Sequence, residues 1–130
     1  MINIMTLTLT MLKGNFTLHR LEPDAEFPEI VLYTSFFAIT RTEDELSIIV
    51  PETVEIESDR SEPGWACFKV DGPLEFSLTG ILAGIASVLA DAKISIFALS
   101  TFDTDYILVK REQVEVAKEA LKSAGYVLKG

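Results

Sequence analysis

Alternating hydrophobic and polar residues predict short strands near the beginning of the chain. Residues 6–12 alternate threonine with leucine or methionine, and residues 16–21 resume the alternation after the turn-forming residues 13–15. Side chains of a strand point alternately to opposite faces, so this pattern is typical of half-buried strands. We therefore expect a β-hairpin over these residues.

The stretch that follows is interrupted by proline and by acidic residues. Residues 22–29 contain two prolines among acidic side chains, which disfavours a full helix. A β-rich run covers residues 31–40, and residues 46–50 form a further expected strand that ends at Pro51. The polar residues 57–64 are rich in turn formers and are the best candidate boundary between two modules.

The second half has a clearer periodicity. Ile81, Ile85, Val88 and Leu89 recur at helical spacing and predict a helix with one apolar stripe. The expected order is strand 65–70, helix 81–92, strand 94–99, strand 106–109, helix 111–124 and edge strand 126–128. This is the β-α-β-β-α-β order of an α+β, ferredoxin-like fold, in which helices cover one face of an antiparallel sheet.

An internal similarity links the two halves. Residues 37–52 and 97–112 each contain a strand, an acidic turn, a second strand and a charged continuation, about 60 residues apart. Two unrelated hairpins can look alike, but the four-residue match at the start of each copy favours duplication. We expect two units in tandem, a degraded one over residues 1–60 and a complete one over residues 61–130.

Composition and charge exclude several classes of protein. The chain has 130 residues, of which 48% are hydrophobic and 24% charged, as in globular proteins. Its net charge of −9 argues against nucleic-acid binding, which requires clustered basic residues. The single cysteine excludes an internal disulfide, and no apolar run is long enough for a membrane helix. Since the N-terminal residues lack the basic start of a signal peptide, a cytoplasmic location is expected.

The start of the first expected helix offers chemistry for an anionic group. Exposed N–H groups and the positive end of the helix dipole near Gly80 can bind a carboxylate, and glycine allows close approach. The alternative is a tight entry turn in which Thr79 caps the helix. Asp103 and Asp105 lie in a later turn. Aspartate is common in turns for conformational reasons, and this is one explanation for both residues. The other is that Asp105 accepts hydrogen bonds from an ammonium group.

Catalytic patterns are sparse. His19, the only histidine, lies in an alternating strand, and Cys67 lies in another, so both fit structural roles better than a nucleophile–base pair. Asp103 and Asp105 alone supply too few ligands for a metal ion. No phosphate-binding glycine loop is present, because residues 80–84 lack the lysine and hydroxyl that such a loop requires. We expect neither catalysis nor a cofactor nor a bound metal.

A family resemblance extends this interpretation. GILAGIASVLADAKISIFALSTFDTDYILV, residues 80–109, resembles an ACT domain, with the Ser-Thr-Phe-x-x-Asp pattern of residues 100–105 as its most specific part. The resemblance is to stand-alone bacterial double-ACT proteins related to CASTOR-type arginine sensors, and to the regulatory ACT pairs of aspartokinase. It implies amino-acid binding at an ACT–ACT interface, often between subunits. The ligand-binding residues that it implies are Gly80, Ile81, Thr101, Phe102 and Asp105.

One position departs from the arginine sensors. Leu78 stands where those proteins have an acidic residue that holds the arginine side chain, so the resemblance does not carry over arginine as the ligand. We expect an amino-acid-binding regulatory protein that forms a homodimer or higher oligomer. The alternative function is an interaction or assembly module without a ligand, and a small enzyme that uses Asp105 or Cys67 is a third hypothesis.

Overall fold

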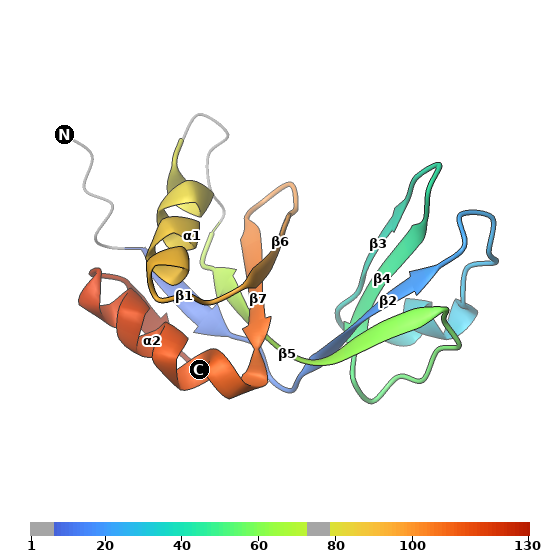
Figure 1. Ribbon diagram of the computed structural model, residues 1–130, viewed down its shortest axis with the longest axis horizontal. Helices are drawn as coiled ribbons and strands as arrows, with labels where there is room; N and C mark the ends of the chain where they lie inside the picture. The colour runs from blue at the N-terminus through green and yellow to red at the C-terminus, as the bar shows by residue number, and fades with distance from the viewer. Residues whose placement is uncertain (1–6, 73–78) are drawn as a thin grey trace. The chain divides into compact units, whose positions relative to one another are not determined.

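The computed structural model describes residues 7–72 and 79–130 (Figure 1). The chain forms two compact units. Unit 2 comprises residues 14–65, and unit 1 comprises the described parts of residues 1–13 and 66–130. The division at residue 60 that was expected from the sequence differs from these units in the placement of residues 1–13 and of residues 61–65.

Unit 2 is a four-stranded antiparallel sheet with almost no helix. Its strands lie in the order β3 (Ala38–Arg41), β4 (Leu46–Pro51), β2 (Phe16–Leu21) and the first part of β5 (Arg60–Val70). A short 3-10 helix, η2 (Glu29–Tyr33), stands before the hairpin. Its core is small and apolar, and is formed by Leu21, Val31, Leu46, Ile48 and Val50.

Unit 1 combines a sheet with two helices. After β5 come α1 (Ile81–Asp91), β6 (Ile96–Ser100), β7 (Asp105–Lys110), the 3-10 turn η3 (Arg111–Gln113), α2 (Val114–Ser123) and β8 (Val127–Lys129). The N-terminal strand β1 (Thr8–Met11) pairs antiparallel with β5 and parallel with β8, while β7 pairs with β5 and β6. Both helices lie on one face of this sheet (Figure 1). The expected α+β, ferredoxin-like fold is confirmed.

Side chains from α1, α2 and the sheet enclose the larger core. Ile85 and Leu89 of α1, Ala117 and Leu121 of α2, and Ile107 of β7 are all fully buried. The stripe that predicted α1 is therefore the face that packs on the sheet. No helix in the described part of the chain has the length and apolar character needed to cross a bilayer.

Two local predictions are wrong. β1 and β2 do not form a hairpin with each other, because each pairs with a different stretch of the eleven-residue β5. The run 31–40 is not a continuous strand either, since η2 occupies its beginning after the turn-favouring Pro28, whose φ is −68°. β5 already begins at Arg60, inside the polar segment expected to be a boundary.

The hairpins β3–β4 and β6–β7 share one loop design. Arg41 pairs with Leu46 and Ser100 with Asp105, so each loop has four residues, and the two are 59 positions apart. In both loops the first residue is threonine, whose N–H donates to the carbonyl of the fourth residue, at 2.9 Å and 2.8 Å. This common geometry supports the duplication expected from the sequence, at an offset of 59 from the loop onward.

Candidate functional site

The start of α1 has a glycine at its N-cap position. Gly80 is this N-cap residue, with φ of 78° and ψ of 3°, and among the described residues no side-chain hydrogen bond caps the first turn. Thr79 therefore does not fill the capping role considered for it. Gly80 is exposed, and a Cβ placed on it would meet nothing within 4 Å. Its own carbonyl accepts from the N–H of Gly84 at 2.8 Å, so the N–H groups before Gly84 remain as the first-turn donors.

The loop between β6 and β7 is held from inside. The Thr101 hydroxyl donates to the carbonyl of Thr104 at 3.2 Å, and the Thr104 N–H donates back to that hydroxyl at 3.4 Å. The Thr104 side chain is buried, and its hydroxyl donates to the Val70 carbonyl of β5 at 2.6 Å. These bonds fix the loop to the end of the neighbouring strand.

Asp105 begins β7 and faces its cross-strand partner Ser100. The Ser100 hydroxyl donates to Oδ1 of Asp105 at 2.5 Å, which orients the carboxylate. Among the described residues no basic side chain forms an ion pair with Asp105. Its negative charge and remaining lone pairs can therefore accept hydrogen bonds from a cationic group.

The chain path brings the helix start and the loop to one end of unit 1. After α1, Lys93 adopts a left-handed conformation with φ of 63°, and the chain reverses into β6. The eleven residues of α1 and the five residues of β6 each span about 16 Å. β6 consequently returns to the end at which α1 began, as Figure 1 shows.

The other two candidate residues differ in their surroundings. Ile81 is half-buried and packs against the core of unit 1, so it anchors the first turn of α1. Phe102 is 80% exposed at the tip of the loop, and it is not a core residue in this chain. Leu78, the position that departs from the arginine sensors, lies outside the described residues.

Two further residues, which the sequence alone did not indicate, shape this end of the unit. Thr104 looked like an ordinary turn residue, yet its buried hydroxyl bonds to another strand. Ser100 was noted only as part of a motif, although it orients the Asp105 carboxylate. Ser100 and Asp105 lie on the two sides of the four-residue loop, and this spacing is the signal that could have identified them as a pair, once the loop length was known.

Cys67 and His19 have surroundings that suit structural roles. Burial of the Cys67 thiol in β5 raises its pKa to about 12, which keeps it protonated and unreactive at neutral pH. His19 lies in β2 of unit 2, where its Nδ1 is 2.8 Å from the Ser58 hydroxyl, and burial lowers its pKa. Within the described ranges, no group of three or more histidine, cysteine or acidic residues could hold a metal ion.

The fold of unit 1 is that of a ferredoxin-like module. The start of α1 and the β6–β7 loop lie at the same end of this module. The family profile described as "ACT domain" matches residues 60–123, and a second profile, described as an N-terminal domain, matches residues 14–59. The crystal structure of protein Atu0741 from Agobacterium tumefaciens is 39% identical, with a TM-score of 0.86, over 95% of this chain and 92% of that one. The chain belongs to the ACT-domain family.

Further relatives include longer proteins. The human protein CASTOR3P is 33% identical over 72% of this chain and 65% of its own length. The human cytosolic arginine sensor for mTORC1 subunit 1 is 33% identical over 68% of this chain, which spans only 29% of that sensor. Aspartate kinase from Clostridium acetobutylicum shares the fold at 18% identity, with a TM-score of 0.64, over 86% of this chain and 33% of the kinase.

Proposed function

We propose that this protein is a regulatory module that binds a free amino acid at the start of α1 and the β6–β7 loop. The ligand carboxylate is received by the first-turn N–H groups after Gly80, and its ammonium group by Asp105. The main support is that an uncapped helix start and an oriented, unpaired carboxylate lie at one end of the same unit. These groups complement the two charges of a zwitterion.

The remaining candidate residues have distinct parts in this proposal. Thr101 keeps the loop in shape through its bonds to Thr104, and Ile81 fixes the first turn against the core. Phe102 supplies an apolar wall for the ligand side chain. Similarity to an arginine sensor supports an amino acid as the ligand class, whereas Leu78 gives no reason to choose arginine.

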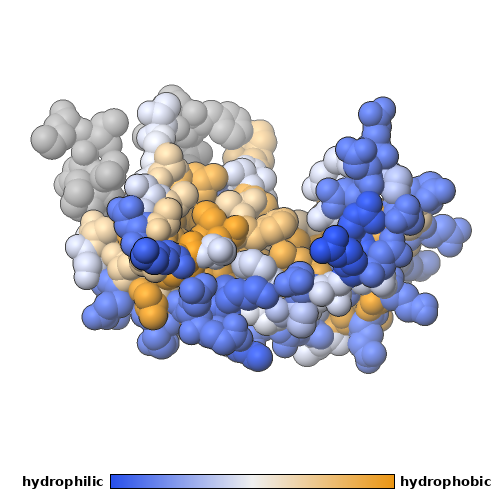
Figure 2. All heavy atoms as spheres, in the orientation of Figure 1, coloured by the Kyte–Doolittle hydropathy of each residue, from blue (hydrophilic) through white to orange (hydrophobic). Residues whose placement is uncertain are grey.

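A second copy of the chain is part of the proposal, because Gly80 and Phe102 are exposed in a single copy. Phe102 is 80% exposed, and α1 carries no charged residue before Asp91. Figure 2 shows hydrophobic side chains over α1 and the β6–β7 hairpin on the face toward the viewer. An ACT unit of a second copy, packed on this face, would enclose the ligand and exclude water from its charged groups.

Thermal unfolding with each of the twenty amino acids tests the ligand class. A ligand at about 100 times its dissociation constant stabilises the folded state by about 2.7 kcal/mol, so one amino acid should raise the melting temperature. A flat response to all twenty at millimolar concentration would contradict the proposal and would favour the assembly module without a ligand.

Asp105→Asn tests the assigned ammonium acceptor. Loss of a charge-assisted hydrogen bond, about 1.5–3 kcal/mol, should weaken binding by roughly tenfold to a hundredfold while the fold is kept. Asp103→Asn is the matched control, because it removes the same charge from an exposed position of the same loop. Equal effects of the two substitutions in calorimetric titrations would mean that Asp105 is not a specific contact.

A further inference from the structure

A cluster of exposed hydrophobic side chains lies in unit 2, away from the proposed ligand site in sequence. Five of the eight large hydrophobic residues that are exposed in the described part of the chain fall within residues 27–37. They are Phe27, Ile30, Leu32, Tyr33 and Phe37. Apolar patches of this kind often mark interaction sites.

None of these five exposed side chains belongs to the core cluster of unit 2. Val31 is the residue of η2 that is fully buried, and it belongs to the core cluster of unit 2. A 3-10 helix has three residues per turn, so Ile30 and Tyr33 share one outward side. They are 53% and 80% exposed, and the hydroxyl of Thr34 donates to the Val31 carbonyl at 2.9 Å, which closes the turn.

Exposed acidic residues are interspersed with the hydrophobic ones in this stretch of the sequence. Asp24, Glu26 and Glu29 are exposed, and no basic residue occurs between Arg20 and Arg41. Within the described residues none of the three carboxylates forms an ion pair. We call the exposed residues of 24–37 the acidic–aromatic surface.

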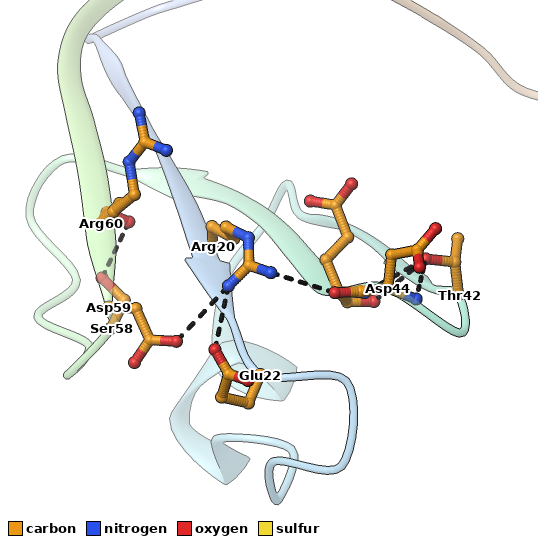
Figure 3. Close-up of polar contacts among 8 residues, drawn as sticks. Arg20, Glu22, Thr42, Asp44, Ser58, Asp59 and Arg60 are labelled. Atoms are coloured by element: carbon orange, nitrogen blue, oxygen red, sulfur yellow. Dashed lines mark hydrogen bonds and ion pairs between the residues drawn. The ribbon is translucent and has the colours of Figure 1, made fainter.

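Two arginines hold the chain around this surface in place. The guanidinium group of Arg41 donates to the carbonyls of Pro23 and Ala25, the latter at 2.9 Å. Arg20 lies 3.1 Å from Glu22 and donates to the Asp44 carbonyl at 3.0 Å (Figure 3). Because the flanking segment is already fixed, little conformational entropy is lost when a partner binds.

We propose that the acidic–aromatic surface is the docking site for a different protein that presents basic residues beside apolar ones, such as a basic amphipathic helix. The apolar row of Ile30 and Tyr33 would receive its apolar side chains, and the surrounding carboxylates its lysine or arginine groups. A two-fold contact with a second copy would place equal acidic groups against one another. Anionic lipid would be repelled for the same reason.

Binding of a defined peptide to the full chain tests this surface. The probe is a short fluorescent peptide of leucine and lysine at amphipathic helical spacing, with a peptide of leucine and glutamate as the charge control. We expect the lysine peptide alone to bind and its affinity to fall with added salt. Backbone amide signals of residues 24–37 should shift most in the NMR spectrum during the titration.

Paired variants separate this surface from general attraction to a protein of net charge −9. Leu32→Ser with Tyr33→Ser should weaken binding about tenfold, whereas Val116→Ser with Val127→Ser, which removes two exposed hydrophobic residues of unit 1, should not. Glu26→Gln with Glu29→Gln should also weaken binding more than Glu112→Gln with Glu119→Gln.

Three results would overturn the proposal. These are equal losses in the matched variants, the largest peptide-induced shifts lying outside residues 24–37, and a dimer that Leu32→Ser with Tyr33→Ser dissociates. The last result would assign the surface to a second copy. None of these measurements contains a free amino acid, so their outcome is distinct from the test of the ligand site.

Discussion

At the level of single residues, Gly80 combines a conformational role with the proposed role in binding. Its φ of 78° is in the left-handed region, which glycine adopts at little cost, and the space beside it is open. A side chain there would strain the backbone and would project from the helix start. The two effects can be measured separately, because stability and ligand affinity are independent observables.

Gly80→Ala should lower the free energy of unfolding by about 1 kcal/mol and should also weaken amino-acid binding. Gly14→Ala is the matched control, since Gly14 has φ of 76° and equally open surroundings in the turn before β2. It should show a similar loss of stability in urea unfolding with unchanged affinity. Unchanged affinity in Gly80→Ala as well would remove this helix start from the ligand site.

His19 gives the chain a pH-dependent contribution to stability. The Ser58 hydroxyl donates to the Arg60 carbonyl at 3.2 Å, so it accepts from Nδ1–H of His19. Nε2 is buried and has no hydrogen-bond partner among the described residues. A proton added to Nε2 would be buried without an acceptor, which agrees with the lowered pKa of this histidine.

Stability should therefore fall as pH decreases below about 6.5, because the unfolded chain takes up a proton at His19 that the folded chain does not. Above that pH both states hold neutral histidine and the contribution is constant. His19→Asn keeps a donor near the Nδ1 position and cannot titrate. The difference in unfolding free energy between wild type and this variant should change between pH 7.5 and 5, and a constant difference would contradict the assignment.

At the level of elements, the loop of the hairpin β6–β7 is held in place by a side-chain hydrogen bond that could not be predicted from the sequence. Thr104 reaches from the loop to the Val70 carbonyl of β5, a contact between residues 34 positions apart. Thr104→Val should lower stability by about 1–2 kcal/mol and should weaken ligand binding, because the loop is released from β5. Thr104→Ser keeps the hydroxyl and should retain most of the affinity in calorimetric titrations; equal losses would point to packing of the methyl group instead.

The uncharged outer side of α1 leads to a prediction about assembly. Ala83, Ser87 and Ala90 are exposed and small, and they lie on the side away from Ile85 and Leu89. If a second copy packs there, Ser87→Glu should shift the molecular mass measured by light scattering from dimer toward monomer. Ser123→Glu, an exposed position at the end of α2, should leave the mass unchanged. A monomeric wild type would contradict the dimer itself.

Strongly periodic elements were the predictable part of the fold. The apolar stripe of α1 depends on neighbours in sequence, and the helix is present, as are the strand expected over 94–99 and the helix expected over 111–124. Pairing partners were less predictable. β1 and β2 had the pattern of a hairpin, but alternation does not specify which strand lies alongside, and the long β5 takes both.

The candidate site shows the same division. The helix start could be placed from the sequence, because the apolar stripe begins at Ile81, directly after Gly80, whereas the left-handed conformation of Gly80 was not predicted. The orientation of Asp105 by Ser100 and the anchoring of the loop by Thr104 could not, because both depend on side-chain directions in a folded hairpin. The resemblance supplied the ligand residues as a set, and their role as contacts stays a prediction.

For the molecule as a whole, the two hairpin loops predict how many ligands bind. With the offset of 59, Leu46 stands in unit 2 where Asp105 stands in unit 1, and Leu46 is 1% exposed in the core. Unit 2 thus lacks the carboxylate proposed to accept the ammonium group. Calorimetric titration should give one amino acid per chain, and Leu46→Ala, although destabilising, should leave that stoichiometry unchanged. Two sites per chain would contradict the assignment.

The position of β1 has a consequence for synthesis on the ribosome. This strand is translated before both of its partners, β5 and β8. Unit 2 is continuous in sequence and can fold before β8 has been made. Unit 1 is complete only when β8 pairs with β1, so a variant in which β8 is removed leaves β1 with an exposed edge and is prone to aggregate.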